Sequence, residues 1–249
     1  MGMIKATILD AEDNELNVID DEGVYTIHFE ARNDDAANNY VVPADITVTC
    51  IKADHLLFSD VDYDDYFADP VAYVAKKRFM NGYANTNLFG SYDNITRGQV
   101  ACVLYNMALD ARKVNETDLV YNEDTGYVTG FSDVNGKNYY GAAIAWAKQA
   151  GVVNGYGDGT FKPEQTVTRE EFCAMLANYA SKFDDGYAEG DVDTLVDFDD
   201  AAQVSDWAEK VVAWGVENDI IGNGGFLAPS SNIIRADAAC MVYNYANAE

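Results

Sequence analysis

The hydrophobic pattern of the chain changes near residue 57. Before that point apolar and polar residues alternate, strictly in "VYTIHFEA" (24–31) and nearly so in "ADITVTCIKA" (44–53). Alternation of this kind is typical of β-strands. It predicts three strands, at about 3–9, 24–31 and 46–52. Because a small isolated sheet is only marginally stable, we expect residues 1–57 to be part of a β-sandwich.

After residue 57 the apolar positions follow a helical period, and the sequence occurs three times. "FSDV" at 58–61 returns at 131–134 and as "FDDA" at 198–201, while "ITRGQ" at 95–99 returns as "VTREE" at 167–171 and "IIRAD" at 233–237. Each unit predicts a helix, a turn and a second helix, and three such pairs should pack on one another. We expect repeats at 58–109, 131–181 and 198–249, joined by polar connectors at 110–130 and 182–197. The predicted fold class is mainly α.

Aromatic residues recur at matching places in the three units. One follows each opening, at Phe67, Tyr140 and Trp207. Another stands eight residues before each turn, at Tyr73, Trp146 and Trp214. A phenylalanine lies in each turn, at Phe89, Phe161 and Phe226.

The second helix of each unit begins with an arginine. Thr168 and Glu171 have the spacing of a capping box, in which each side chain accepts from the other residue's backbone amide. The first turn of a helix favours negative charge, yet Arg169 comes first. The matching residues are Arg97 and Arg235.

Two explanations for these cations remain open. The guanidinium groups could pair with carboxylates of the protein, such as Asp60, Asp133 or Asp200. They could also bind an anion from outside, together with the backbone amides of the helix start.

Composition narrows the classes of function. Asp and Glu number 42 against 16 Lys and Arg, for a net charge of -26. This charge argues against partners with phosphate backbones and against anionic lipid surfaces, so we expect no nucleic acid. No apolar run approaches the roughly 20 residues of a membrane span, so we expect no membrane insertion. Residues 1–15 lack the regions of a signal peptide, which leaves a cytosolic protein or a piece of a longer one.

The sequence predicts neither an enzyme nor a metal site. There are four cysteines and two histidines, and no C-x-x-C pair. Three cysteines, Cys102, Cys173 and Cys240, lie in apolar helical runs and are expected to be small core residues. His28 and His55 lie in the β segment or just after it, with no nucleophile motif nearby. We expect no cofactor.

The Phe-x-Asp-Val openings, the passage "NGYGDGTFKPEQTVTREEF" (154–172) and the threefold occurrence resemble the S-layer homology family over residues 58–246. The resemblance implies three repeats in a pseudo-threefold spindle. It also implies an exported bacterial protein, of which this chain would be a C-terminal part, bound non-covalently to the cell wall or S-layer. The implied partner is a secondary wall polysaccharide, commonly pyruvylated. It would lie in grooves between repeats, with the arginines Arg97, Arg169 and Arg235 as principal contacts.

Two tetrapeptides depart from the family pattern. The first, at 96–99, keeps the capping box of Thr96 with Gln99 but loses the acid, and the third, at 234–237, has Ile234 in place of the capping hydroxyl. Losing the cap should weaken the third helix start by about 1 kcal/mol. We therefore expect the groove lined by Arg169 to match the family best and that lined by Arg235 least.

Further ligand contacts can be predicted from residue type. A ketal-linked pyruvate offers a planar carboxylate, which suits the two-pronged guanidinium better than an ammonium group. Tyr73, Trp146 and Trp214 could stack on sugar rings, although aromatic residues in a helix also serve as core. Hydroxyl contacts could come from Gln99, Glu171 and Asp237, and Gly155 lies in the turn beside them.

The sequence predicts wall anchoring as the function. A structural surface-layer subunit that acts mainly by lattice self-association is the alternative. A helical repeat with a cytosolic partner is a third possibility.

Overall fold

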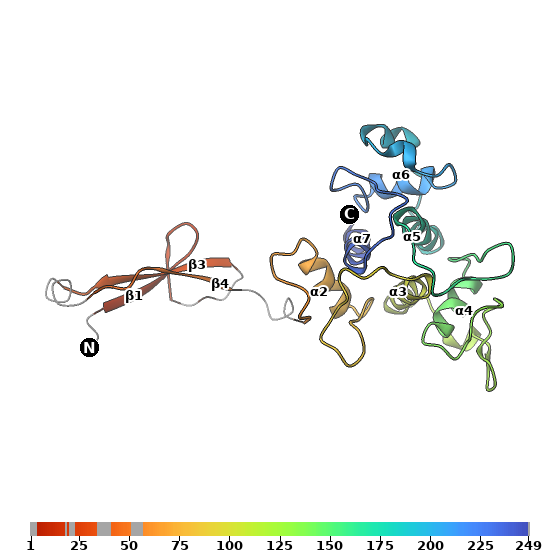
Figure 1. Cartoon of the computed structure of the whole chain (residues 1–249), viewed down its shortest axis with the longest axis horizontal. Helices are drawn as coiled ribbons and strands as arrows, with labels where there is room; N and C mark the ends of the chain where they lie inside the picture. Colours follow the sequence, from red (N-terminus) through yellow and green to blue (C-terminus); the bar gives the residue numbers. More distant parts are fainter. Residues whose placement is uncertain (1–3, 18, 20–22, 34–40, 51–56, 249) are drawn as a thin grey trace. The chain divides into compact units, whose positions relative to one another are not determined.

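The computed structural model describes residues 4–17, 19, 23–33, 41–50 and 57–248. The chain divides into two compact units, Met1–Leu57 and Phe58–Glu249 (Figure 1).

The first unit contains an antiparallel sheet. Its strands β1 (Ile4–Leu9), β2 (Glu15–Leu16), β3 (Gly23–Ala31) and β4 (Ile46–Cys50) lie in the order β2-β1-β3-β4. The three predicted strands are confirmed where the structure describes them, while residues 3 and 51–52 of the predicted strands lie outside the described residues. Strand β2 is too short to produce an alternating pattern. The described residues of this unit form one sheet and supply no facing second layer of a β-sandwich. His28 lies next to the Asp45 carboxylate at 3.0 Å, and His55 lies outside the described residues.

The second unit is built from pairs of helices, each pair with a short helix followed by a longer one. The short helices are α2 (Ala68–Lys76), α4 (Gly141–Gln149) and α6 (Glu209–Glu217). The long helices are α3 (Arg97–Asp110), α5 (Arg169–Phe183) and α7 (Arg235–Asn247). Figure 1 shows the long helices near the centre of this unit and the short helices around them. The mainly α prediction is confirmed for this unit.

Each short helix packs against the long helix of another repeat. Helix α4 contacts α3, α6 contacts α5, and α2 of the first repeat contacts α7 of the last. A helix pair therefore covers its apolar face with a neighbouring repeat, as expected of repeats that cannot bury that face alone.

The backbone before the long helices closes this arrangement into a ring. The amide of Ile95 donates to the carbonyl of Ile233, that of Ile233 to Val167, and that of Val167 to Ile95, at 2.9–3.2 Å. All three side chains are fully buried. The first and third repeats are thus joined directly, although they lie far apart in the sequence.

An aspartate fixes the turn of each repeat. The Asp60 carboxylate accepts hydrogen bonds from the amides of Phe89, Gly90 and Ser91. Burial raises the pKa of this carboxyl, but the bonds from these amides outweigh it and bring the pKa below its ordinary value. Asp133 and Asp200 accept from the matching pairs of amides, 161–162 and 227–228.

The hydrogen bonds that Asp200 accepts show that the sequence alignment of the third turn was wrong by one residue. Its carboxylate binds the amide of Leu227, which is fully buried in the place that Phe89 and Phe161 take in the other turns. Phe226, which the sequence aligned with those residues, is 62% exposed.

The connectors also contain local structure. A two-stranded ribbon, β5 (Tyr121–Asn122) and β6 (Gly126–Tyr127), follows the short helix Glu116–Asp118. The second connector contains the 3₁₀ helix Val192–Asp197, whose Leu195 is buried.

Candidate functional site

The arginine at the start of each long helix reaches across to the turn of another repeat. Its Nε donates to a backbone carbonyl there at 2.9 Å: Arg97 to Phe161, Arg169 to Leu227, and Arg235 to Phe89. The guanidinium groups therefore join the repeats through carbonyl oxygens. The aspartates proposed as internal partners, Asp60, Asp133 and Asp200, bind turn amides instead.

Each arginine lines a groove, which we name after it. The grooves have volumes of about 360 Å³ for Arg97, 690 Å³ for Arg169 and 380 Å³ for Arg235. All three share one plan. The arginine comes from one repeat, the turn and the long helix from the next repeat around the ring, and an exposed aromatic residue from the remaining repeat. These aromatic residues are Trp207, Tyr66 and Tyr139, in the same order.

Arg97 and Arg235 have nearly identical surroundings. The Nη2 of Arg97 donates to the carbonyl of Asn154 at 3.2 Å, and that of Arg235 to Asn81 at 2.8 Å. Each guanidinium also lies over two aromatic rings, with its Cζ 4.8–5.0 Å from the ring centroids: Tyr156 and Phe161 for Arg97, Tyr83 and Phe89 for Arg235.

These two arginines are buried without a carboxylate partner among the described residues. Arg97 is 8% exposed and Arg235 5%. Burial lowers the pKa of Arg235, an effect that nearby Tyr83 and Asp93 partly offset, and a guanidinium remains charged at neutral pH. No buried side-chain N or O atom in the described part of the chain lacks a hydrogen-bond partner. Their Nη1 groups, which bind no described residue, therefore keep some contact with solvent.

Arg169 differs from the other two. Its Nη1 forms an ion pair with Oδ2 of Asp237 at 2.9 Å, and the hydroxyl of Tyr66 donates to Oδ1 of the same carboxylate at 2.6 Å. Burial and this hydrogen bond raise the pKa of Tyr66. The groove predicted to match the family best is thus the one whose arginine already has an acidic partner.

The third residue of each long helix lies in a different groove from the arginine of its own helix. Glu171 lines the Arg97 groove, Asp237 the Arg169 groove, and Gln99 the Arg235 groove. Gly155 also lines the Arg97 groove, and a Cβ there would lie 2.3 Å from the Phe131 ring and 2.5 Å from the Thr160 carbonyl oxygen.

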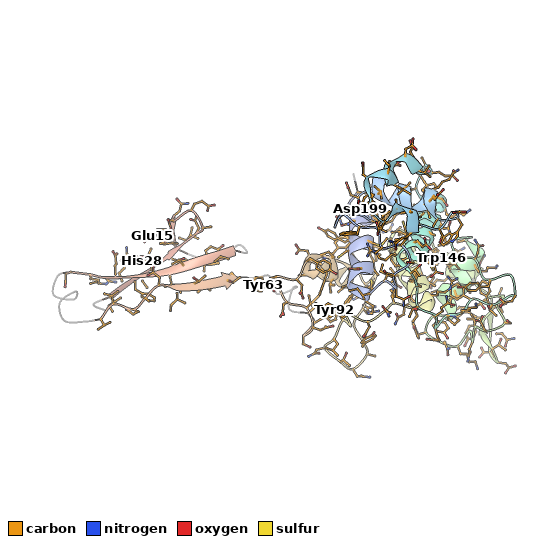
Figure 2. All side chains as sticks on the ribbon, turned by 45° about the horizontal axis from the view of Figure 1, so that its top comes forward. Glu15, His28, Tyr63, Tyr92, Trp146 and Asp199 are labelled. Atoms are coloured by element: carbon orange, nitrogen blue, oxygen red, sulfur yellow. The ribbon has the colours of Figure 1, made fainter. Side chains whose placement is uncertain are left out.

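The structure does not bring the predicted stacking residues to the grooves. Trp146 and Trp214 are each 5% exposed, and Trp146 stacks on the half-buried ring of Phe183. Figure 2 shows Trp146 within the helical unit. Tyr73 and Trp214 line a separate cavity of about 660 Å³ at the C-terminal ends of the long helices. The two tryptophans are therefore buried core residues, which was the alternative to stacking on sugar rings.

The exposed aromatic residues Trp207, Tyr66 and Tyr139 immediately precede the N-cap residues of the short helices, which are Phe67, Tyr140 and Ala208. The sequence alignment was one residue out in the third repeat, where it matched Trp207 with Phe67 and Tyr140. These exposed residues could have been found from the sequence, because in two repeats they are the first of two adjacent aromatic residues, "YF" at 66–67 and "YY" at 139–140.

Other candidate sites find no support among the described residues. Burial raises the pKa of the Cys102, Cys173 and Cys240 thiols to about 12, so they remain protonated. In the described part of the chain, no His, Cys, Asp and Glu side chains cluster into a metal site, and no helix is both long and apolar enough to cross a membrane.

Comparison with known proteins identifies the family. Residues 57–101, 130–173 and 197–239, together more than half of the chain, match the family model described as S-layer homology domain. The chain belongs to the S-layer homology domain family. The expected family and its three tandem repeats are confirmed, and membership supports a general role in attachment at the cell surface.

Relatives of this S-layer homology chain occur in larger proteins. An amylopullulanase of Thermoanaerobacterium thermosulfurigenes and the exoglucanase XynX of Acetivibrio thermocellus are each 28% identical over 188 residues, 75% of this chain, but 9% and 16% of their own lengths. A cellulosome-anchoring protein of A. thermocellus is 27% identical over 166 residues, 66% of this chain and 34% of its own. The chain thus spans a minor part of each relative, and the two enzyme names do not give this chain an activity.

Proposed function

We propose that residues 58–249 anchor a bacterial protein to its cell wall by binding an acidic, pyruvylated wall glycan in the grooves. In this proposal the three repeats act as one pseudo-threefold spindle, and the protein acts outside the cell. The name of the cellulosome-anchoring relative agrees with this role.

The observation that carries the proposal is the pair of buried cations, Arg97 and Arg235. Removing a charge from water costs several kcal/mol unless partners compensate, and here the partners are carbonyl dipoles and aromatic faces. Among the described residues no carboxylate completes either site. An external anion that binds the accessible Nη1 group would supply the missing negative charge.

The remaining lining suits a sugar acid. A pyruvate ketal presents its carboxylate on the outside of a saccharide, where it can reach the edge of the guanidinium. Trp207 and Tyr139 offer flat apolar faces for the ring. Asn178 and Asn106 line the same grooves, and their side-chain oxygens can accept from hydroxyl groups, while Nδ2 of Asn106 donates to the Phe79 carbonyl.

The net charge of -26 does not oppose this binding. Charges on the surface are screened over about 8 Å at physiological ionic strength, so distant carboxylates contribute little within a groove. Affinity should therefore depend on the terminal acid and its neighbouring sugars.

Co-sedimentation with purified wall polymer tests the proposal. We expect the chain to bind pyruvylated polymer and to bind polymer stripped of pyruvate at least about tenfold more weakly, because charge-assisted hydrogen bonds contribute about 1.5–3 kcal/mol. Arg97→Lys combined with Arg235→Lys keeps both charges but loses the fork, and should weaken binding to a similar extent.

Arg112→Lys, at an exposed arginine outside the grooves, is the matched control and should bind as the wild type does. Equal binding to both polymers would refute the proposal. So would full binding by a double variant whose thermal melt shows it to be folded.

A further inference from the structure

The three grooves differ at the third residue of each long helix, and this inference rests on the proposed function. We propose that Asp237 closes the Arg169 groove to acidic groups, so that one chain binds two acidic saccharides, in the Arg97 and Arg235 grooves. The third helical residue thus determines which grooves accept an acid.

Asp237 occupies the position that an incoming carboxylate would need. Its two oxygens are held by different repeats, Oδ2 by Nη1 of Arg169 at 2.9 Å and Oδ1 by the hydroxyl of Tyr66 at 2.6 Å. The paired side chains are partly buried, at 18% exposure for Arg169 and 27% for Asp237. A competing anion would have to break the ion pair with Arg169 and would then lie next to the displaced Asp237 carboxylate. The two like charges would repel each other, which makes binding unfavourable.

Loss of the capping box explains why Asp237 is available for this pairing. In α5, Oε2 of Glu171 accepts the backbone amide of Thr168 at 3.0 Å, and the threonine hydroxyl accepts in return. In α7 the N-cap is Ile234, which makes no side-chain cap bond. The aspartate is also one methylene shorter than glutamate, and its oxygens bind outward, to Arg169 and Tyr66.

The other two grooves lack such an acidic lock. Glu171 remains held by its own helix start, and Gln99 forms the same capping box in α3 but is uncharged. The Arg235 groove, with Gln99, therefore has the least negative lining at this position. We expect it to bind the acid more tightly than the Arg97 groove, which reverses the order expected from family likeness.

The bonding of Arg169 differs in a second respect. Within the described residues its guanidinium lies over no aromatic ring, and Leu227 takes the place of one of the two rings, that of Phe89 and Phe161. The Asp237 carboxylate therefore offsets the cost of burying the Arg169 charge. For Arg97 and Arg235, two aromatic rings and a second backbone carbonyl have this role.

Calorimetric titration of the full chain with a disaccharide carrying ketal-linked pyruvate tests the inference through its stoichiometry. The wild type should bind two ligands. Asp237→Asn keeps the size of the side chain and removes its charge, and should raise the number to three. Gln99→Asp, made together with Thr96→Ile so that no capping box holds the acid, places a short acid opposite Arg235 and should lower the number to one.

The outcomes separate this inference from the proposed function. Three equal sites in the wild type, or two in folded Asp237→Asn protein, would overturn the inference and leave glycan anchoring intact. Absence of binding in every variant would overturn the proposed function itself. If Asp237→Asn does not fold, the titration of the Thr96→Ile and Gln99→Asp double variant decides, since an unchanged number of two would also overturn the inference.

Discussion

The arginine that begins each long helix shows what a single residue reveals from sequence alone. The first turn of a helix favours negative charge, so the positively charged Arg97, Arg169 and Arg235 were recognisable as unusual from the sequence. The acceptors could not be predicted, because they are backbone carbonyls such as that of Phe161, and a carbonyl has no residue-type signature. The ion pair of Arg169 with Asp237 depends on a contact between repeats that residue spacing does not encode.

Gly155 provides a test at the scale of one residue. Gly155→Ala would place a Cβ within 2.5 Å of both the Phe131 ring and the Thr160 carbonyl oxygen. Because a packed interior must shift to accept it, we expect a loss of about 1–3 kcal/mol in unfolding free energy and weaker polymer binding. Gly157→Ala, where a Cβ would meet nothing within 4 Å, is the matched control. Denaturant unfolding measures both, and equal losses would show that the close approach is unimportant.

The helices and strands were the most predictable features. Both capping boxes, Thr96 with Gln99 and Thr168 with Glu171, are confirmed, because caps depend on residues three apart. The missing cap at Ile234 is confirmed as well. The packing of α2 on α7 was not predictable from helical periodicity, which shows an apolar face but not the helix that covers it.

Removing a cap should destabilise the helical unit by a predictable amount. In Thr168→Ala the amide of Glu171 loses its acceptor at the start of α5, so we expect a cost of about 1 kcal/mol. For a domain of this size the melting temperature should fall by about 2–4 °C. Thr125→Ala, at an exposed threonine in a connector, should change it little. Equal melting temperatures for the wild type and both variants would contradict the role of the cap.

At the scale of the whole molecule, the number of repeats was evident from the sequence, and the residues whose contacts close the ring were not. The hydrogen bonds among Ile95, Val167 and Ile233 join segments whose sequences show only that each is apolar. Once the ring is closed, each groove takes its arginine, its turn and its aromatic residue from three different repeats.

Shortening the chain tests this shared construction of the grooves. A chain that ends at residue 197 lacks Trp207, the third turn and Arg235, so each groove loses at least one wall. We expect loss of all polymer binding in co-sedimentation, and not of one third of it. Residues 58–249 alone should bind like the full chain. Retention of two thirds of the capacity by the shortened chain would show that the grooves are independent.

Ring closure also constrains how such a protein can evolve. In an open solenoid, duplicating or deleting one unit lengthens or shortens an array and leaves distant units unchanged. Here a fourth copy would separate α7 from α2, and would have to reopen the hydrogen-bonded circuit at its centre. Changes in valency should therefore arise from point substitutions within a fixed trio, or from appending a complete second trio, rather than from gain or loss of single copies.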